Sequence, residues 1–120
     1  MARPLILVVE DEAILRISAT FILEEAGFDT LDAASADEAI VHLETDQQIL
    51  IVFTDIDMPG SMNGLRLAVV IRSRWPAIDL VLTSGHVLVA DQDIPARGHF
   101  LAKPYNSEQL VRIMRSFGHA

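Results

Sequence analysis

The chain has 120 residues, of which 51% are hydrophobic, a net charge of −8 and no cysteine. This length suits one domain with a real core, so we expect a single domain over residues 1–120, without disulfides or thiolate metal sites. The acidic charge disfavours direct nucleic-acid binding, which needs a basic face. The chain has no apolar run of membrane-spanning length and no signal-peptide cleavage site, so we expect a cytoplasmic protein.

The N-terminal half alternates between strand and helix patterns. An apolar, β-branched run at 5–9 predicts a strand, and 28–34 alternates weakly, as an edge strand does. Residues 13–26 and 35–46 have helical periodicity, and a buried strand is expected at 49–53. The helical stripes are Ile14, Ile17 and Phe21, ending at Gly27, and then Ala36, Ala39, Ile40 and Leu43 after a capping box of Ser35 and Glu38.

The C-terminal half continues this alternation with one exception. Residues 64–75 predict a helix that Pro76 ends, and 78–82 and 98–102 predict the fourth and fifth strands. Between these strands, 86–97 offers only about one apolar turn, so we expect the fourth helix to be short, frayed or missing. The last helix begins with Asn106 and Gln109 as caps and carries Leu110, Ile113, Met114 and Phe117 on its inner stripe.

Strands that alternate with helices predict an α/β fold with a parallel sheet. In a doubly wound sheet, ligands bind beyond the carboxyl ends of the strands, where the strand order reverses. If the order is 2-1-3-4-5, the first and third strands are neighbours, and the polar residues that follow the strands converge at one edge. These residues are Glu10 and Asp11 after the first strand, Asp55 and Asp57 after the third, Thr83 at the end of the fourth and Lys103 after the fifth.

Each of these residues taken alone has an ordinary structural explanation, as a solvated turn residue, a strand-forming threonine or a surface lysine. Together they favour a joint site. Carboxylates that lie close together repel one another, and a divalent cation relieves this repulsion. Oxygen ligands without imidazole or thiolate suit Mg²⁺, and a carboxylate beside Mg²⁺ can attack a phosphoryl group.

Four segments, "VVEDE", "FTDIDMPG", "LTSG" and "FLAKPY", resemble the receiver domain of two-component response regulators, and the resemblance spans essentially the whole chain. It implies a flavodoxin-like, three-layer (βα)5 fold in which Asp55 is the phosphoacceptor. It also implies Mg²⁺ or Mn²⁺ as cofactor. The metal ligands would be Glu10, Asp11, Asp55 and the backbone carbonyl of Asp57; Thr83, Lys103 and Phe100 would form the phosphoryl-binding and switch group; and a cis peptide bond would precede Pro104.

The resemblance further implies a signalling module, phosphorylated by a histidine kinase or a histidine phosphotransfer protein, that acts on a downstream protein partner rather than on nucleic acid or a membrane. Two departures from the family pattern stand out. Phe100 occupies the position of a switch aromatic without a tyrosine hydroxyl, and Asp57 stands where many relatives have a neutral residue.

Three alternatives remain. A magnesium-dependent phosphatase of the haloacid dehalogenase type uses a similar D-x-D motif, but it carries the motif after its first strand rather than its third. A flavodoxin-like cofactor binder would need a phosphate-cradling loop after the first strand, where this chain has three acids. A receiver that acts only as a binding module would not be phosphorylated. Magnesium-dependent phosphorylation distinguishes the last of these from an active receiver.

Overall fold

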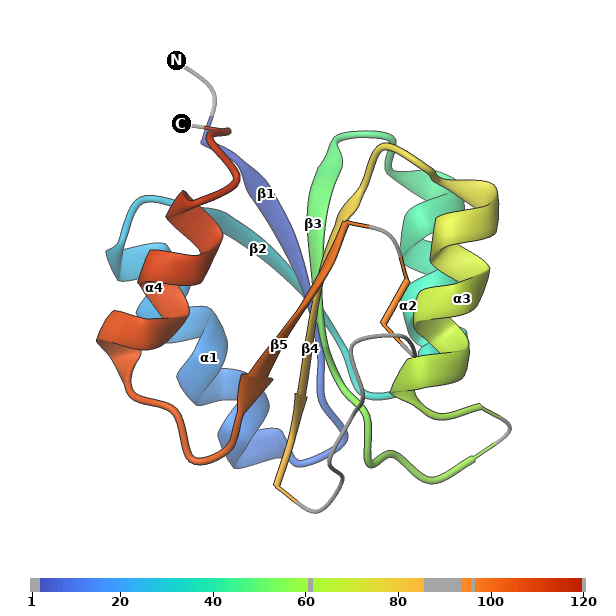
Figure 1. The fold of residues 1–120 in the computed structure, drawn as a ribbon, viewed down its shortest axis with the longest axis horizontal. Coiled ribbons are helices and arrows are strands. Elements are labelled where there is room, and N and C mark those ends of the chain that lie inside the picture. The colour runs from blue at the N-terminus through green and yellow to red at the C-terminus, as the bar shows by residue number, and fades with distance from the viewer. Residues whose placement is uncertain (1–2, 61, 86–93, 96, 120) are drawn as a thin grey trace.

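The computed structural model describes residues 3–60, 62–85, 94–95 and 97–119. It is an α/β sandwich in which one parallel sheet lies between two layers of helices (Figure 1). The strands are β1 (Leu5–Val9), β2 (Asp29–Ala33), β3 (Ile49–Asp55), β4 (Asp79–Ser84) and β5 (Gly98–Ala102), and the helices are α1 (Ala13–Glu25), α2 (Ala36–Thr45), α3 (Gly64–Arg74) and α4 (Ser107–Arg115). The five strands have the order β2-β1-β3-β4-β5, which confirms the predicted fold class and strand order.

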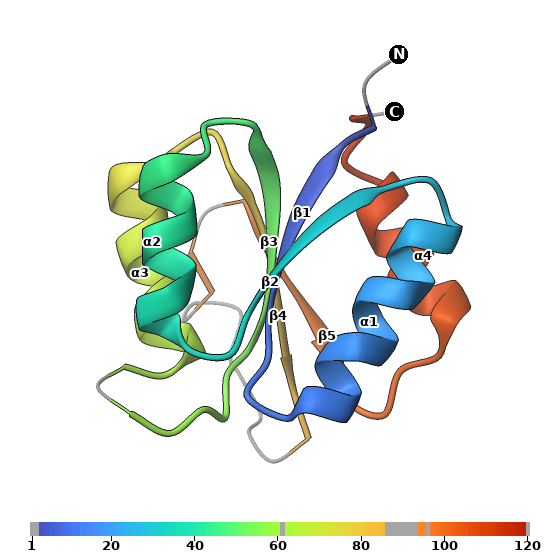
Figure 2. The same cartoon turned by 180° about the vertical axis from the view of Figure 1, so that it is seen from behind.

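The sheet divides the core into two parts. Helices α1 and α4 cover one face, and α2 and α3 cover the other, as the front and back views show (Figures 1 and 2). Because successive side chains of a strand point to opposite faces, Ile6 and Val8 pack toward α1 and α4, whereas Leu7 and Val9 pack toward α2 and α3. All four side chains are buried, so β1 is a fully internal strand, as its continuous apolar run predicts.

Side chains at the helix N-termini satisfy backbone donors that would otherwise lack partners. The Ser35 hydroxyl accepts a hydrogen bond from the backbone N–H of Glu38 at 3.2 Å. Asn106 and Gln109 form a complete capping box, in which each side chain accepts a 2.8 Å hydrogen bond from the other residue's backbone N–H. These contacts confirm the two helix starts predicted from the sequence.

The apolar stripe of α1 does not face the core. Ile14, Ile17 and Phe21 are exposed, and the helix instead packs on the sheet through Ala19 and Leu23. The helix itself was predicted correctly. Periodicity identifies a face that is apolar but not what covers that face, and α1 has apolar residues on both sides.

The segment 86–97, where a short, frayed or missing fourth helix was expected, lies mostly outside the described residues, so that prediction remains untested. Within the described ranges, no helix is both long and apolar enough to cross a membrane.

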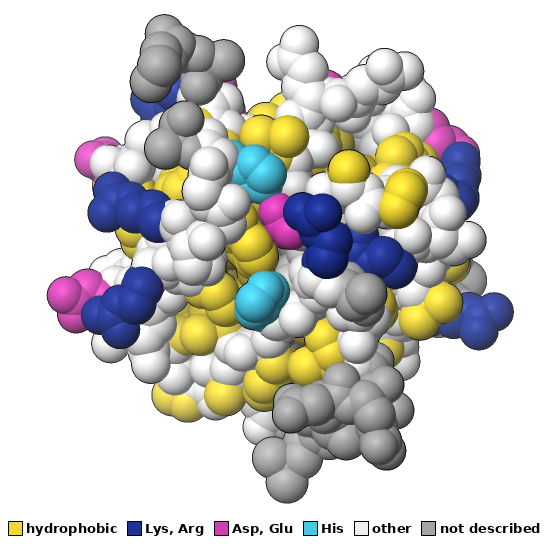
Figure 3. All heavy atoms as spheres, turned by 45° about the horizontal axis from the view of Figure 1, so that its top comes forward, with side chains coloured by type: hydrophobic (Ala, Val, Ile, Leu, Met, Phe, Trp, Pro, Cys, Tyr) yellow, Lys and Arg dark blue, Asp and Glu magenta, His cyan; other side chains and the backbone are white. Residues whose placement is uncertain are grey.

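A cluster of charged side chains lies at the end of the sheet where β4 begins. The Asp79 carboxylate is buried, and it accepts hydrogen bonds from Arg97 at 2.9 Å and from His119 at 2.7 Å. Figure 3 shows histidine, acidic and basic side chains side by side on this surface. The contacts fix the segment after α4 to the sheet and satisfy the buried acid, so this group serves a structural purpose.

Candidate functional site

Strand register brings four polar residues to the opposite edge of the sheet. Val9 pairs with Thr54, so Glu10 lies level with Asp55, and Asp55 pairs with Thr83 on β4. The backbone N–H of Lys103 donates to the carbonyl of Ser84 at 3.1 Å, which extends the row to the end of β5. Residues distant in the sequence therefore converge at the carboxyl edge, as the parallel topology requires.

Three acids at this edge form a cluster with the spacing of a metal site. Glu10, Asp11 and Asp55 each offer a carboxylate oxygen, and these oxygens lie within 4.8 Å of one another. The carboxylates of Glu10 and Asp55 are buried. A donor set made only of oxygens suits a hard divalent cation, and such a cation would relieve the repulsion between the acids.

Lys103 joins the two buried carboxylates. Its ammonium lies 3.2 Å from Asp55 Oδ2 and 3.4 Å from Glu10 Oε2. Burial alone would lower the pKa of Lys103, but the charges of Glu10 and Asp55 outweigh it and raise this pKa above its usual value. The lysine is therefore held in its charged form, and the site carries a fixed positive charge beside Asp55.

Glu10 is the acid whose ionisation is most perturbed. Burial raises the pKa of its carboxyl to about 7, and the hydrogen bond from the backbone N–H of Glu12 to Oε1 opposes this shift only in part. The nearby charge of Asp55 raises the pKa further, whereas Lys103 lowers it. One lysine is not enough to neutralise the acids, so the cluster favours an additional cation, either a proton or a metal ion.

Within the described part of the chain the hydroxyl of Thr83 has no hydrogen-bond partner, although the residue is only 2% exposed. By contrast, the buried Thr54 of β3 donates its hydroxyl proton to the carbonyl of Asp55 at 3.0 Å. An unsatisfied buried hydroxyl costs about 1–3 kcal/mol. Thr83 pairs with Asp55 in the sheet, so this costly feature lies beside the candidate nucleophile.

Asp57 makes two contacts in the site. Its backbone N–H donates to Asp55 Oδ1 at 3.1 Å, and its own Oδ2 accepts a 2.6 Å hydrogen bond from the Ser84 hydroxyl. The second contact ties the loop after β3 to the end of β4. Sequence analysis missed Ser84, because the pairing depends on how the loop after β3 meets the end of β4. The metal-ligand role of the Asp57 carbonyl remains a prediction.

Gly64 is a second residue that sequence analysis missed. It begins α3, and its backbone N–H donates to the carbonyl of Ile56 at 3.1 Å. A Cβ at this position would collide with the backbone carbonyl of Asp55, so only glycine lets α3 start this close to the site. The signal in the sequence was a glycine directly after a capping asparagine, Asn63, whose side chain accepts a hydrogen bond from Arg66.

The remaining predicted residues lie on β5 and just after it. Phe100 is partly buried and packs against the core on the α2 and α3 side, and its switch role remains a prediction. The Lys103–Pro104 peptide bond is cis, the predicted isomer. Tyr105 packs edge-on against Phe53, with ring centroids 5.7 Å apart, and burial raises the pKa of its hydroxyl.

Comparison with known proteins identifies the family to which the chain belongs. Residues 6–115 match the model of the response regulator receiver domain. The chain therefore belongs to this family, whose members are phosphoacceptor modules of two-component signalling rather than catalytic enzymes. Membership of this family implies a histidine kinase as partner.

The individual relatives span both regulators and kinases. The chain is 35% identical over 117 residues to the C4-dicarboxylate transport transcriptional regulatory protein DctD of Rhizobium meliloti, covering 95% of this chain and 25% of DctD. It is 32% identical to the sensor kinase CckA of Brucella abortus, over 92% of this chain and 12% of CckA. A receiver protein from Pseudomonas putida superposes with a TM-score of 0.86 and 32% identity, over 97% of this chain and 98% of that one. The chain thus spans about a quarter or less of these two curated relatives.

The raised pKa of Glu10 predicts a pH dependence of stability in the metal-free protein. The folded-state pKa, about 7, exceeds the ordinary value of 4.5, so the folded protein binds more protons between these values and loses stability as pH rises through this window. Between pH 5 and pH 8 we expect the free energy of unfolding of Glu10→Gln to fall by about 2 kcal/mol less than that of the wild type, because glutamine cannot ionise. Urea unfolding in EDTA at pH 5 and pH 8 measures it. Parallel pH profiles for the two proteins would contradict the prediction.

The unsatisfied hydroxyl of Thr83 predicts that a substitution at this position can stabilise the protein. Thr83→Val removes an unsatisfied buried group while keeping the shape of the side chain, and we expect the free energy of unfolding to rise by about 1 kcal/mol. Thr54→Val is the matched control, because it deletes a hydroxyl that has a partner, and it should lower stability by about as much. Equal destabilisation by both variants in urea unfolding would contradict the prediction.

Proposed function

We propose that Asp55 is the phosphoacceptor of this receiver domain and that it takes the phosphoryl group from a phosphohistidine of a histidine kinase or phosphotransfer protein. The observation that carries the proposal is the position of Asp55. Its buried carboxylate lies between the Lys103 ammonium and the acid cluster, and it pairs in the sheet with the unsatisfied Thr83. An attacking carboxylate needs nearby charges that stabilise the transferred group, and these neighbours supply them.

Mg²⁺, or Mn²⁺ in its place, is the proposed cofactor. Glu10, Asp11 and Asp55 would hold the ion through their carboxylates, with the carbonyl of Asp57 as a further ligand. The all-oxygen donor set and its 4.8 Å spacing support this assignment. When bound, the ion would neutralise part of the charge on the carboxylates and on the phosphoryl oxygens.

The side chains of the chain itself account for the transfer step. An Asp55 oxygen forms a bond to phosphorus as the bond from phosphorus to the donor's imidazole nitrogen breaks, and the imidazole leaves. The Lys103 ammonium, already 3.2 Å from Asp55 Oδ2, then pairs with the phosphoryl oxygens. The Thr83 hydroxyl donates to the same group and so gains the partner that it lacks in the unphosphorylated state.

The signal would leave the domain through a change of shape. Movement of Thr83 toward the phosphoryl group shifts the end of β4, and Asp57, hydrogen-bonded to Ser84, couples the loop after β3 to this movement. We propose that the resulting surface binds a downstream protein. The net charge of −8 supports a protein rather than a nucleic acid as this partner.

Phosphorylation by a small phosphodonor tests the proposal directly. With acetyl phosphate and Mg²⁺, we expect the intact mass of the wild type to rise by one phosphoryl group, and we expect no rise for Asp55→Ala or for the wild type in EDTA. Asp57→Asn is the matched control, since it changes the neighbouring carboxylate and should still be labelled. No mass gain on the wild type would refute phosphoacceptor function, and equal gain on Asp55→Ala would refute Asp55 as the site.

The side chain of Asp57 should shorten the lifetime of the phosphoryl group. Its carboxylate adds a negative charge two residues after Asp55, whose side chain accepts a 3.1 Å hydrogen bond from the Asp57 backbone N–H, and repulsion would destabilise the aspartyl phosphate. Asp57→Asn keeps an oxygen that can accept from Ser84 and removes the charge, so we expect hydrolysis to slow about threefold, the equivalent of roughly 0.7 kcal/mol. Loss of label after the phosphodonor is removed, followed by mass measurement, gives the rate. Equal rates for the two proteins would defeat the idea.

A further inference from the structure

Arg16 is a largely buried charge that the helix carrying it does not favour. It lies near the N-terminus of α1, and its side chain is only 20% exposed. A positive charge at this end of a helix opposes the helix dipole. The first turn of α1 contains no acidic residue that would offset this effect. The contacts that hold Arg16 in place must therefore lie outside the helix.

Two segments outside α1 supply these contacts. Nη1 of Arg16 donates a 2.8 Å hydrogen bond to the backbone carbonyl of Glu10, and its Nε lies 3.4 Å from Asp32 Oδ2. Asp32 belongs to β2, where it pairs with Val8 of β1. The guanidinium thus joins the start of α1 to the end of β1 and to the edge strand β2. Because the charge of Asp32 offsets that of Arg16, the contact brings little net positive charge toward the acid cluster.

The contact with Glu10 helps to fix the backbone on both sides of Asp11. The carbonyl of Glu10 belongs to the first of the two peptide groups that flank Asp11, and it accepts from Arg16. The second carries the N–H of Glu12, which donates to Glu10 Oε1 at 3.2 Å. The N–H of Glu10 is also held, by a 3.0 Å hydrogen bond to the carbonyl of Ala33. An aspartate side chain has only two torsions, so its backbone largely sets the direction of its carboxylate.

Asp11 depends on its backbone more than the other acids of the cluster do. Glu10 and Asp55 are buried, and both contact Lys103. Asp11 is less buried, and within the described part of the chain its carboxylate forms no ion pair. Its oxygen nevertheless lies within 4.8 Å of theirs. The contacts that fix the backbone around Asp11 therefore decide whether three carboxylates or two face the cation position.

We propose that Arg16 is a positioning residue, which holds Asp11 in the geometry that binds the divalent cation. It acts through the Glu10 carbonyl and the backbone of Asp11, and it does not touch the ion. The inference rests on the proposed function, since it concerns the cation assigned to this cluster, and extends it to a residue outside the cluster. Loss of a residue that orients metal ligands weakens metal binding by about 10–100-fold.

Magnesium binding to the unphosphorylated protein tests the proposal. Arg16→Met keeps an apolar stem and removes the hydrogen-bond donors, and we expect the dissociation constant for Mg²⁺ to rise about tenfold in isothermal titration calorimetry. Loss of a positive charge by itself would strengthen cation binding, so this result would have the opposite sign to a purely electrostatic effect. Urea unfolding in EDTA checks that the variant is folded. An unchanged or smaller dissociation constant would overturn the proposal.

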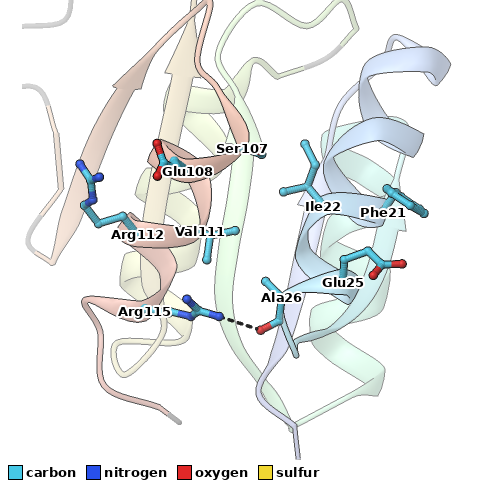
Figure 4. A pocket seen from close by; sticks show the side chains of 9 residues that line it. All are labelled: Phe21, Ile22, Glu25, Ala26, Ser107, Glu108, Val111, Arg112 and Arg115. Carbon is cyan, nitrogen blue, oxygen red and sulfur yellow. Dashed lines mark hydrogen bonds between the residues drawn. The ribbon is translucent and has the colours of Figure 1, made fainter.

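Arg115→Met is the matched control. Arg115 also donates from its guanidinium to a backbone carbonyl, that of Ala26 at 3.2 Å, at the opposite end of α1 from the acid cluster (Figure 4). The change deletes the same kind of contact to the same helix, so Mg²⁺ should bind as it does to the wild type. Equal weakening by Arg16→Met and Arg115→Met would reveal a general effect on α1 and would overturn the proposal.

Arg16→Lys is the conservative variant. Its ammonium keeps the charge and can donate to the Glu10 carbonyl, but it lacks the planar fork that reaches two acceptors, so we expect binding about threefold weaker than in the wild type. A lysine variant that binds Mg²⁺ no better than Arg16→Met would overturn the proposal. If Arg16→Met does not fold, Arg16→Lys decides alone, and wild-type affinity in that variant would overturn it.

The labelling reaction separates a positioning role from a direct role in phosphoryl transfer. With acetyl phosphate, Arg16→Met should need about tenfold more Mg²⁺ for its half-maximal rate and should approach the wild-type rate once Mg²⁺ saturates. A lower saturating rate with an unchanged requirement for Mg²⁺ would overturn the proposal, because Arg16 would then act on the transfer itself.

The binding and labelling results together distinguish this inference from the proposed function. If Arg16→Met weakens Mg²⁺ binding but acetyl phosphate does not label the wild type, phosphoacceptor function fails and this inference stands. If labelling of the wild type requires Mg²⁺ but both proteins bind the ion equally, the function stands and this inference is overturned. A wild type that binds no Mg²⁺ overturns both the cofactor assignment and this inference.

Discussion

Two buried carboxylates at one edge of the sheet set the central constraint on this molecule. Asp55 and Glu10 end up side by side because β1 and β3 are neighbours, and neither can be ionised there without a compensating positive charge. Lys103 supplies one such charge, 3.2 Å from Asp55 and 3.4 Å from Glu10. Lys103 follows β5, so the position of this last strand determines whether Glu10 and Asp55, far earlier in the chain, have a positive charge beside them.

Buried charges have different surroundings at the two ends of the sheet's strands. Where β4 begins, Asp79 has both Arg97 and His119 as partners, and the group is closed. Where β4 ends, one lysine contacts two of the three clustered acids, and the hydroxyl of Thr83 has no hydrogen-bond partner among the described residues. Carboxylates that are only partly neutralised and a hydroxyl without a hydrogen-bond partner lower the stability of the fold. The same groups can bind a cation and an anionic ligand. This difference separates the structural edge from the functional edge.

Helix α1 links the site to the outer surface of the domain. Its N-terminus follows the acids of the cluster, its inner side packs through Ala19 and Leu23, and its outer side carries the exposed side chain of Phe21. One helix thus has two apolar faces, of which the core needs only one.

Local pattern in the sequence was sufficient for the elements and for the types of residue at the site, whereas the strand order was expected only from the resemblance to a known family. Apolar runs, capping residues and polar groups after the strands identified Asp55, Glu10, Asp11, Thr83 and Lys103 as candidates, because these signals depend only on neighbours along the chain. Tertiary structure alone decided which of two apolar faces of α1 is buried, that Ser84 bonds to Asp57, and that Gly64 must approach the Asp55 carbonyl. Each of these facts depends on the distance between segments that are far apart in the chain, and periodicity carries no information about such distances.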